Sequence, residues 1–294
     1  MQGHYNAEFG LLLGNAVEAA WLGFLEGLLA LVVIVGIWQR AALRRFGHAL
    51  REGFPRWQML GGMVGATMIM GQAGTIPVLG VALFAVLLVS GQTLMSLVVD
   101  TWGLAPGGRR PVTGARVLGA VLTIVGIALA VAGRMHVGSL SIGLVLTVIG
   151  IGALLPFQFA FNAQVGRAAR SPLVAALVNF TVGSLMLSGV LLIRGGGLVR
   201  PPSPLDNPGV WAAGLLGVFA VIVAALVVPT VGVLVFSLLM VCGQLVFSLL
   251  VDVAAGQVRV TGTLVAGVLV CVVAVIVASG AQTHVALPGA GRRP

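Results

Sequence analysis

Gln, Ser and Asp recur at four-residue spacing in two otherwise apolar stretches of this chain. Residues 91–100 read GQTLMSLVVD and residues 243–252 read GQLVFSLLVD. Side chains four residues apart lie on one face of an α-helix, so each stretch predicts an apolar helix with one polar stripe. The amides of Gln92 and Gln244 can hydrogen-bond a substrate or a neighbouring helix, and both roles are open at this stage.

Four carboxylates lie within or at the ends of apolar segments, where an unpaired charge is costly. Glu26 is about ten residues into its segment, near the expected membrane centre, and Glu18 is two turns earlier. We expect both to be candidates for binding a proton or another coupling ion, against packing or interfacial solvation as the alternative. Asp100 and Asp252 end their helices, where we expect capping or pairing with a loop arginine.

Three amides and one tryptophan complete the candidate substrate-binding set. Gln158 and Asn162 stand one turn apart after Pro156, at the predicted end of an apolar segment. Kinked helices that line a transport cavity often carry such pairs. Asn179 is a lone polar residue in the next segment, and Trp21 lies deeper than the other tryptophans. The alternative for the amides is a hydrogen bond between helices.

The composition predicts an all-α polytopic membrane protein. Hydrophobic residues make up 59% of the 294 residues, charged residues only 8%, and the mean hydropathy is +1.13. A soluble domain carries about 25% charged residues, and about 20 apolar residues span a bilayer as a helix. About nine such spans are predicted, at 12–38, 57–76, 77–100, 114–133, 138–161, 172–193, 209–228, 229–252 and 260–280.

The net charge of +9 comes from sixteen arginines in the gaps between apolar segments. It indicates topology rather than a nucleic-acid partner. If the spans alternate, twelve arginines, including those of the basic loop at 39–56, lie on one side and four on the other. The positive-inside rule then predicts a cytoplasmic C-terminus and an N-terminus outside. The sequence has no phosphate-binding loop or metal-ligand cluster, so we expect neither an enzyme nor a cofactor.

The chain contains an internal repeat. Residues Asn6–Ile37 align with Asn162–Ile193 with ten identities in 32, and Pro77–Asp100 align with Pro229–Asp252 with twelve identities in 24. The shared Pro, Gly, Phe, Gln, Ser and Asp stand in register, which apolar composition alone does not explain. Duplication is therefore the better interpretation.

We divide the chain into a first membrane repeat at 1–135 and a second at 136–294. In the second repeat an apolar span precedes Asn162, whereas only five residues precede Asn6. A five-plus-five plan has thus lost its first helix. Either a start upstream of Met1 was missed, which we favour, or the protein works without that helix. Repeats of five spans would insert with opposite orientations, as in many secondary transporters.

The stretch LLPFQFAFNAQVGRAARSPLVAALVNFTVGSLML at 154–187, followed by Pro229 and GQLVFSLLVD, resembles the YdcZ-like family of bacterial inner-membrane proteins. That family belongs to the drug/metabolite transporter superfamily, and its members are usually single five-helix units. This chain resembles two units fused. The resemblance implies an exporter in the inner membrane with a ten-helix, two-fold plan, from which the missing first helix departs.

These observations predict a secondary transporter that exports a small metabolite or amphipathic compound by alternating access. The sequence contains no ATP-binding domain, so the driving force would be protons, another coupling ion or a substrate gradient. The expected partners are the lipid bilayer and the small-molecule substrate. Two alternatives stay open, namely a passive pore or lipid scramblase, and a non-transporting membrane subunit.

Overall fold

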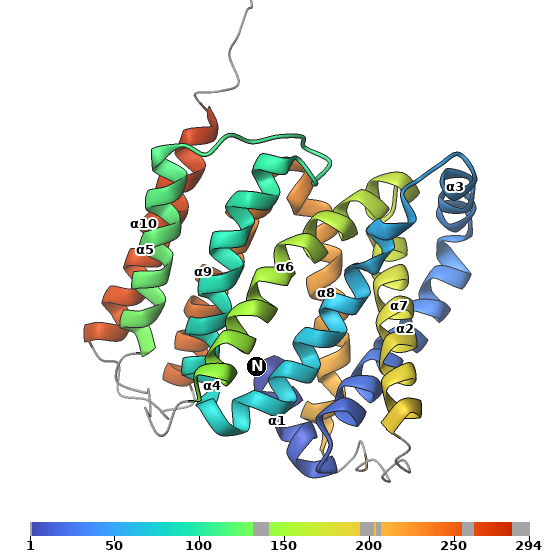
Figure 1. Ribbon diagram of the computed structural model, residues 1–294, viewed down its shortest axis with the longest axis horizontal. Coiled ribbons are helices and arrows are strands. Elements are labelled where there is room, and N and C mark those ends of the chain that lie inside the picture. Colours follow the sequence, from blue (N-terminus) through green and yellow to red (C-terminus); the bar gives the residue numbers. More distant parts are fainter. Residues whose placement is uncertain (1, 132–140, 195–202, 204–206, 255–261, 284–294) are drawn as a thin grey trace, which may run out of the picture.

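The computed structural model is a bundle of helices, with no strand among the residues it describes, which are 2–131, 141–194, 203, 207–254 and 262–283. Figure 1 shows most helices running between the same two ends of the bundle. The elements are α1 (Gln2–Leu13), α2 (Ala16–Trp38), α3 (Arg40–Arg51), η1 (Arg56–Leu60), α4 (Gly61–Trp102), α5 (Gly114–Val131), α6 (Ile142–Ala169), α7 (Pro172–Arg194), α8 (Pro208–Val231), α9 (Val233–Ala254) and α10 (Gly262–Thr283).

The apolar helices match the predicted spans. Six helical segments of the described chain are long and apolar enough to cross a membrane, and three shorter apolar helices lie within α5, α9 and α10. Each of the nine falls on one predicted span. The all-α polytopic fold class is therefore confirmed.

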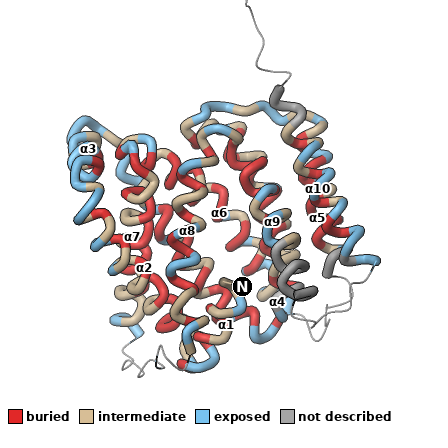
Figure 2. Tube along the Cα trace, turned by 180° about the vertical axis from the view of Figure 1, so that it is seen from behind, coloured by how far each residue is buried: buried red, intermediate tan, exposed pale blue. Residues whose placement is uncertain are grey.

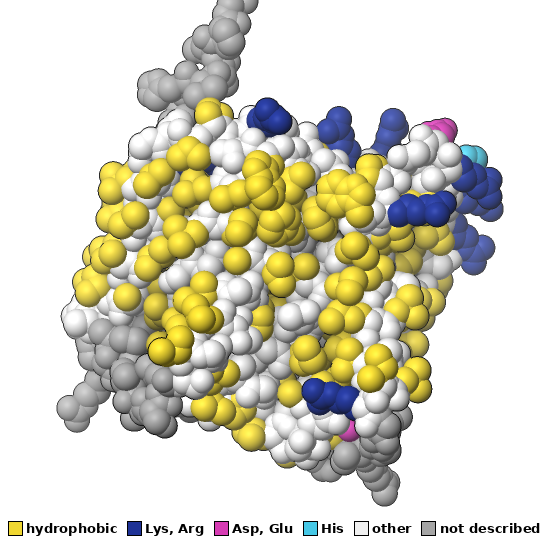
Figure 3. Space-filling view, viewed as in Figure 1, with side chains coloured by type: hydrophobic (Ala, Val, Ile, Leu, Met, Phe, Trp, Pro, Cys, Tyr) yellow, Lys and Arg dark blue, Asp and Glu magenta, His cyan; other side chains and the backbone are white. Residues whose placement is uncertain are grey.

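The prediction that the basic segment at 39–56 is a loop is wrong in part, because α3 occupies residues 40–51. Its arginines and His48 leave Ala42 and Phe46 on one face, and these two side chains are buried. A helix with one apolar stripe and a basic face is typical of the membrane interface. Figure 3 shows dark blue side chains along the upper edge of the molecule, including the corner where Figure 1 labels α3.

Two helix breaks fall at glycines rather than at the prolines predicted to start new helices. Gly80 inside α4 has φ 75° and ψ 156°, and Gly232 between α8 and α9 has φ 84° and ψ 171°. Pro77 and Pro229 stand three residues earlier, within the preceding helix. A positive φ suits glycine because it has no β-carbon, so the glycine in each P-x-x-G sequence turns the chain.

The helix α6 also continues beyond its predicted end. It runs through Pro156 to Ala169, so Gln158 and Asn162 lie inside the helix and not at its end. Proline is tolerated in a membrane helix when neighbouring groups satisfy the freed backbone positions.

The core of the bundle lies where α2, α4, α6, α7 and α8 face one another. Figure 2 shows their buried stretches turned inward. The helices α5 and α10 pair at one edge of the molecule, far from α2, α3 and α7 at the other edge (Figure 1). The site must therefore be sought in the five-helix core.

Candidate functional site

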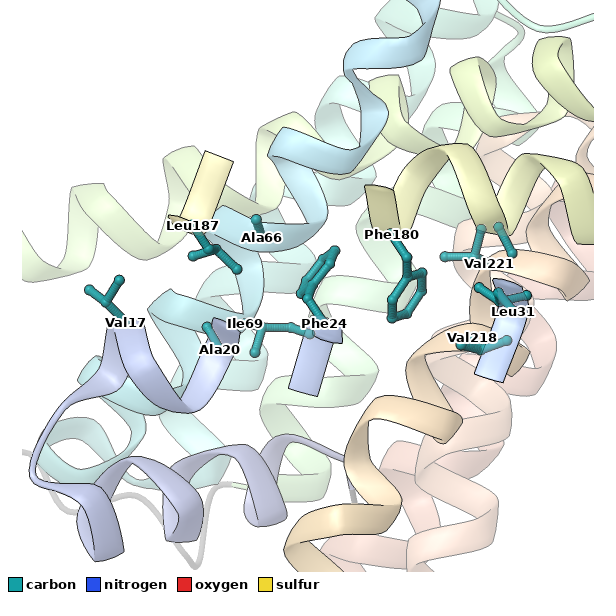
Figure 4. Close-up of a cluster of buried hydrophobic side chains, with 11 residues drawn as sticks. Val17, Ala20, Phe24, Leu31, Ala66, Ile69, Phe180, Leu187, Val218 and Val221 are labelled. Atoms are coloured by element: carbon teal, nitrogen blue, oxygen red, sulfur yellow. The ribbon is translucent and has the colours of Figure 1, made fainter. Parts of the chain in front are cut away.

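Two phenylalanines from related positions of the repeat meet in the core. Phe24 on α2 and Phe180 on α7 are 156 positions apart, and their ring centroids lie 4.8 Å from each other. A β-carbon at Gly27 would overlap the Phe180 ring, and one at Gly183 would overlap the Phe24 ring. Figure 4 shows the two rings side by side. Phe24 contacts Gly183, and Gly27 contacts Phe180. The helices α2 and α7 therefore run antiparallel where they cross, and a local two-fold axis relates them.

A second pair of contacts repeats the same relation. A β-carbon at Gly62 on α4 would overlap the carbonyl oxygen of Asn179, and one at Gly214 on α8 would overlap that of Gly23. Gly62 and Gly214 are 152 positions apart, and Gly23 and Asn179 are 156 apart. The crossing of α4 with α7 thus mirrors the crossing of α8 with α2. These close backbone approaches require residues without a side chain, as is common between membrane helices.

Three predicted substrate-binding residues come together at this crossing, and we call Gln158, Asn162 and Asn179 the amide cluster. Asn179 Nδ2 donates to Asn162 Oδ1 at 3.0 Å. A β-carbon at Gly65 would lie 2.7 Å from Gln158 Nε2 and 3.5 Å from Asn179 Oδ1, so this glycine makes room for the amides. All three side chains are at least 94% buried.

The amide cluster keeps unused hydrogen-bonding capacity. Asn162 Nδ2 and Asn179 Oδ1 are buried and have no hydrogen-bond partner among the described residues. Buried amide atoms in proteins are usually satisfied, so one donor and one acceptor are available here. A hydroxyl, amide or carboxyl group of a solute could use both.

The first repeat has a related arrangement built on α1. Gln2 and Asn6 are the repeat mates of Gln158 and Asn162. Asn6 Nδ2 donates to Gln72 Oε1 at 2.7 Å, and Gln2 Nε2 would lie 3.0 Å from a β-carbon at Gly217, the mate of Gly65. The short helix α1 therefore occupies the place that residues 158–169 of α6 occupy in the second repeat.

Trp21 takes part in a hydrogen bond between helices. Its Nε1 donates to Ser188 Oγ on α7 at 2.9 Å, and Ser188 Oγ in turn donates to the carbonyl of Ser184 at 2.8 Å. In this conformation the indole joins α2 to α7 and does not line the pocket described below.

The two predicted coupling carboxylates lie on α2 but in different surroundings. Glu26 Oε2 is buried at the crossing with α8, where it would lie 2.7 Å from a β-carbon at Gly214. The backbone of Gly214 interacts with this carboxylate, and no hydrogen bond joins its Oε2 to a described side chain. Glu18 is 1% exposed and lies in the first turn of α2, whose N-terminus Asn15 caps. A carboxylate in a first helical turn is favoured by the helix dipole.

The two glutamines of the polar stripes differ in their exposure. Gln92 on α4 is buried, with 5% of its surface exposed. Gln244, its mate on α9, is exposed. Neither lines the pocket, and Ser96 Oγ from the first stripe contacts Ser237 Oγ of α9 at 2.9 Å.

Asp100 joins the two repeats at one end of the bundle. Its Oδ1 accepts a hydrogen bond from Val233 N at 2.9 Å and its Oδ2 accepts one from Leu234 N at 3.2 Å, so it caps the N-terminus of α9. Its Oδ2 also pairs with the buried Arg116 guanidinium. The prediction that Asp100 caps a helix end or pairs with an arginine is confirmed. The side chain of Asp252 lies outside the described residues.

Arg110 binds the C-terminus of α8, on the other side of the helix break at Gly232. Its Nη1 and Nη2 donate to the carbonyls of Val231 at 3.1 Å and Thr230 at 2.8 Å, at the C-terminus of α8. Burial lowers the pKa of the Arg110 guanidinium, and the Asp100 carboxylate partly offsets this. A cation at the end of one helix and a carboxylate at the start of the next complement both helix dipoles. Together they stabilise the break at Gly232.

A pocket of about 350 Å³ opens at the other end of the bundle. Apolar side chains and three threonines line it, with one cation, Arg194, at the end of α7. The threonine hydroxyls donate to carbonyls of their own helices. The lining residues are Ala16, Val17, Thr67, Met70, Gly71, Gly74, Thr75, Thr147, Ile151 and Arg194. The sequence predicted none of them, because no motif marks the place where α2, α4, α6 and α7 diverge.

A family model described as "Putative inner membrane exporter, YdcZ" matches residues 1–129 and 143–277, which is most of the chain. The chain therefore belongs to this family of multi-pass inner-membrane exporters, as its sequence motifs predicted. The family is one of exporters rather than of enzymes. No curated protein matches the chain.

Proposed function

We propose that this YdcZ family member is a secondary transporter that exports small amphipathic compounds by alternating access. The observation that carries the proposal is the antiparallel meeting of α2 with α7 at Phe24 and Phe180, with the same glycine contacts on both sides. A transporter with inverted repeats around a central site can alternate between an outward-open and an inward-open conformation, which the pseudo-two-fold axis of the repeats relates to each other. We assign residues 1–135 and 136–294 to the two repeats.

The pocket and the amide cluster support an amphipathic substrate. Small-molecule sites are mostly apolar cavities of about 300–1,000 Å³ with a few polar groups that fix orientation. Ile151 in the pocket and Gln158 in the cluster are two helical turns apart on the same face of α6. In our proposal a substrate leaves through the pocket, and the amide cluster supplies its polar contacts. Gln92 and Gln244 do not line the pocket in this conformation, and their contact with substrate stays a prediction.

Glu26 is the proposed coupling residue. Its buried oxygen lies at the crossing of α2 with α8, where the two repeats touch. A carboxylate in the membrane interior is costly when charged and unpaired, so gain or loss of a proton would favour different packings of this crossing. We assign Glu18, at the surface end of α2, to stabilising the helix start. A proton gradient would then drive export.

We also propose an orientation for the molecule. Of the arginines in the described ranges, all but Arg194 lie in α3, η1, the connection from α4 to α5, the start of α5, or the end of α6 and the turn after it. These segments meet at one end of the bundle. The positive-inside rule places that end in the cytoplasm, so the C-terminus is cytoplasmic and the pocket faces outward.

Cysteine accessibility in membrane vesicles of defined orientation tests the proposal. Thr75→Cys lies in the pocket, and Val227→Cys is its repeat mate. An impermeant maleimide should label Thr75→Cys from the outer side and Val227→Cys from the inner side. A proton gradient should raise one labelling rate and lower the other. Labelling of both positions from both sides would indicate a pore, and rates that no gradient changes would contradict alternating access.

A further inference from the structure

The short helix α3 carries basic side chains on the face that points away from the protein. Ala42 and Phe46 are buried and belong to one apolar cluster with Val165 of α6 and Val174 of α7. On the opposite side of α3, basic residues stand at the spacing i, i+4, i+8 and i+11, which is a single helical face. They are Arg40, Arg44, His48 and Arg51, all of them exposed. We call these four residues the basic face.

The guanidinium groups around this face lack a counter-charge in the protein. No hydrogen bond or ion pair joins the side chain of Arg44, Arg45 or Arg51 to another residue of the described chain. Arg40 Nε donates only to the backbone carbonyl of Gly36. The segment 39–56 contains five arginines but a single carboxylate, that of Glu52. This excess of positive charge is therefore available to an anion from outside the protein.

The position of α3 indicates where that anion lies. The membrane-spanning helix α2 ends at Trp38, and α3 begins two residues later. Figures 1 and 2 show α3 at an outer corner of the molecule, turned across the direction of the spanning helices. Trp38 is 71% exposed and Trp57 is 47% exposed, and exposed tryptophans are typical of the headgroup level of a bilayer. The basic face therefore lies where lipid phosphates are found.

The surroundings of the basic face favour a lipid over a soluble anion. Leu43 lies on the flank of α3, between its packing face and its basic face, and is 43% exposed. Ile37 at the end of α2 is 57% exposed. Acyl chains can cover such side chains while the arginines contact headgroups. Figure 3 shows the dark blue side chains at this corner reaching from the upper edge onto the side of the molecule.

We propose that α3 is a binding surface for the headgroups of anionic phospholipids. A guanidinium donates two parallel hydrogen bonds to phosphate oxygens. Four or more arginines on an amphipathic helix beside a membrane span are attracted to anionic lipid. A zwitterionic headgroup carries its own cation, so its net attraction is weaker. The proposal concerns lipid binding alone and depends neither on the transport activity nor on the orientation of the molecule.

Tryptophan quenching by brominated lipids tests the proposal at the site itself. In a chain that keeps Trp38, with the other four tryptophans replaced by phenylalanine, a bromine atom quenches fluorescence when its lipid lies beside α3. The protein is placed in phosphatidylcholine vesicles with a small fraction of brominated phosphatidylglycerol or, in parallel, brominated phosphatidylcholine. The anionic lipid should be enriched beside Trp38 about threefold or more over its bulk fraction. Equal quenching by the two lipids would overturn the proposal.

Charge variants show whether the arginines cause the enrichment. Arg44→Gln, Arg45→Gln and Arg51→Gln together should return the lipid ratio beside Trp38 to the bulk ratio. The matched control replaces the same three residues by lysine, keeps the charge, and should keep most of the enrichment. Arg194→Gln removes a charge at the opposite end of the bundle and should change nothing. Loss of enrichment in all of these variants, or in none, would contradict the role of α3.

A second measurement uses the chain with its native tryptophans. Phosphatidylglycerol added to the protein in detergent should raise the unfolding temperature more than phosphatidylcholine with the same acyl chains does. The glutamine variant should lose this difference, and the lysine variant should keep it. An equal rise with both lipids would contradict the proposal. The same rise with inorganic phosphate would indicate a site for a soluble anion and would also overturn it.

Discussion

At the residue scale, Asp100 shows how one side chain joins both repeats. Its carboxylate caps α9 and pairs with Arg116, and both side chains are almost fully buried. Asp100→Asn would leave the Arg116 guanidinium buried without a counter-charge, which costs about 3–5 kcal/mol of stability. Thermal unfolding in detergent should therefore show a large loss. Glu52→Gln, at an exposed site after α3, is the control, and equal losses for both variants would contradict the role of Asp100.

Glu26 carries the coupling prediction. Glu26→Gln keeps the side-chain size but removes the charge that can be titrated, so transport should lose its dependence on a proton gradient while the unfolding temperature stays close to that of the wild type. Flux measured with and without the gradient separates the two effects. Glu8→Gln on α1 is the control. Gradient dependence retained by Glu26→Gln would remove Glu26 from the coupling step.

The sequence identified several site residues but not their partners. Gln158, Asn162 and Asn179 were predicted as polar residues in apolar surroundings, and the structure brings all three together. Asp100 was predicted to cap a helix end or pair with a loop arginine, but no signal marked Arg116 at the start of α5 or Arg110 in the connection before it. The helix that Asp100 caps belongs to the other repeat, and spacing along the chain cannot predict such a contact.

At the element scale, glycines set the helix crossings. Gly62→Ala would drive a methyl group into the carbonyl of Asn179, and such overpacking costs about 1–3 kcal/mol. Gly36→Ala on α2 meets no atom within 4 Å and should be neutral or slightly stabilising, because alanine favours the helix by up to about 1 kcal/mol. Unfolding temperatures of the two variants check this. A Gly62→Ala protein as stable as Gly36→Ala would contradict the crossing.

Helix existence was predictable and helix ends were less so. Apolar segments of membrane-spanning length follow directly from bilayer thickness. Two prolines gave the wrong boundaries, because Pro77 and Pro229 lie inside helices. The span predicted to end at residue 161 continues to Ala169. Gly80 and Gly232 end the helical runs instead, and among so many glycines only the backbone dihedral angles distinguish these two.

At the scale of the whole molecule, the internal repeat predicted which helices correspond to each other. The structure shows which residues form the contacts between them. The contacts of Phe24, Gly27, Phe180 and Gly183 make α2 and α7 antiparallel, the arrangement expected for repeats with an odd number of spans. The pocket could not be predicted, since it arises where helices of both repeats diverge.

The most direct test of an alternating-access exporter is flux in proteoliposomes. Purified protein is reconstituted, and uptake or release of an amphipathic dye is measured against dye concentration, with and without a proton gradient. Our account predicts flux that saturates with concentration and rises with the gradient, and a lowered apparent affinity in Gln158→Ala with Gln58→Ala unchanged. Flux that increases linearly and ignores the gradient would indicate a passive pore, and either that result or the absence of flux for every dye and gradient tested would contradict the account.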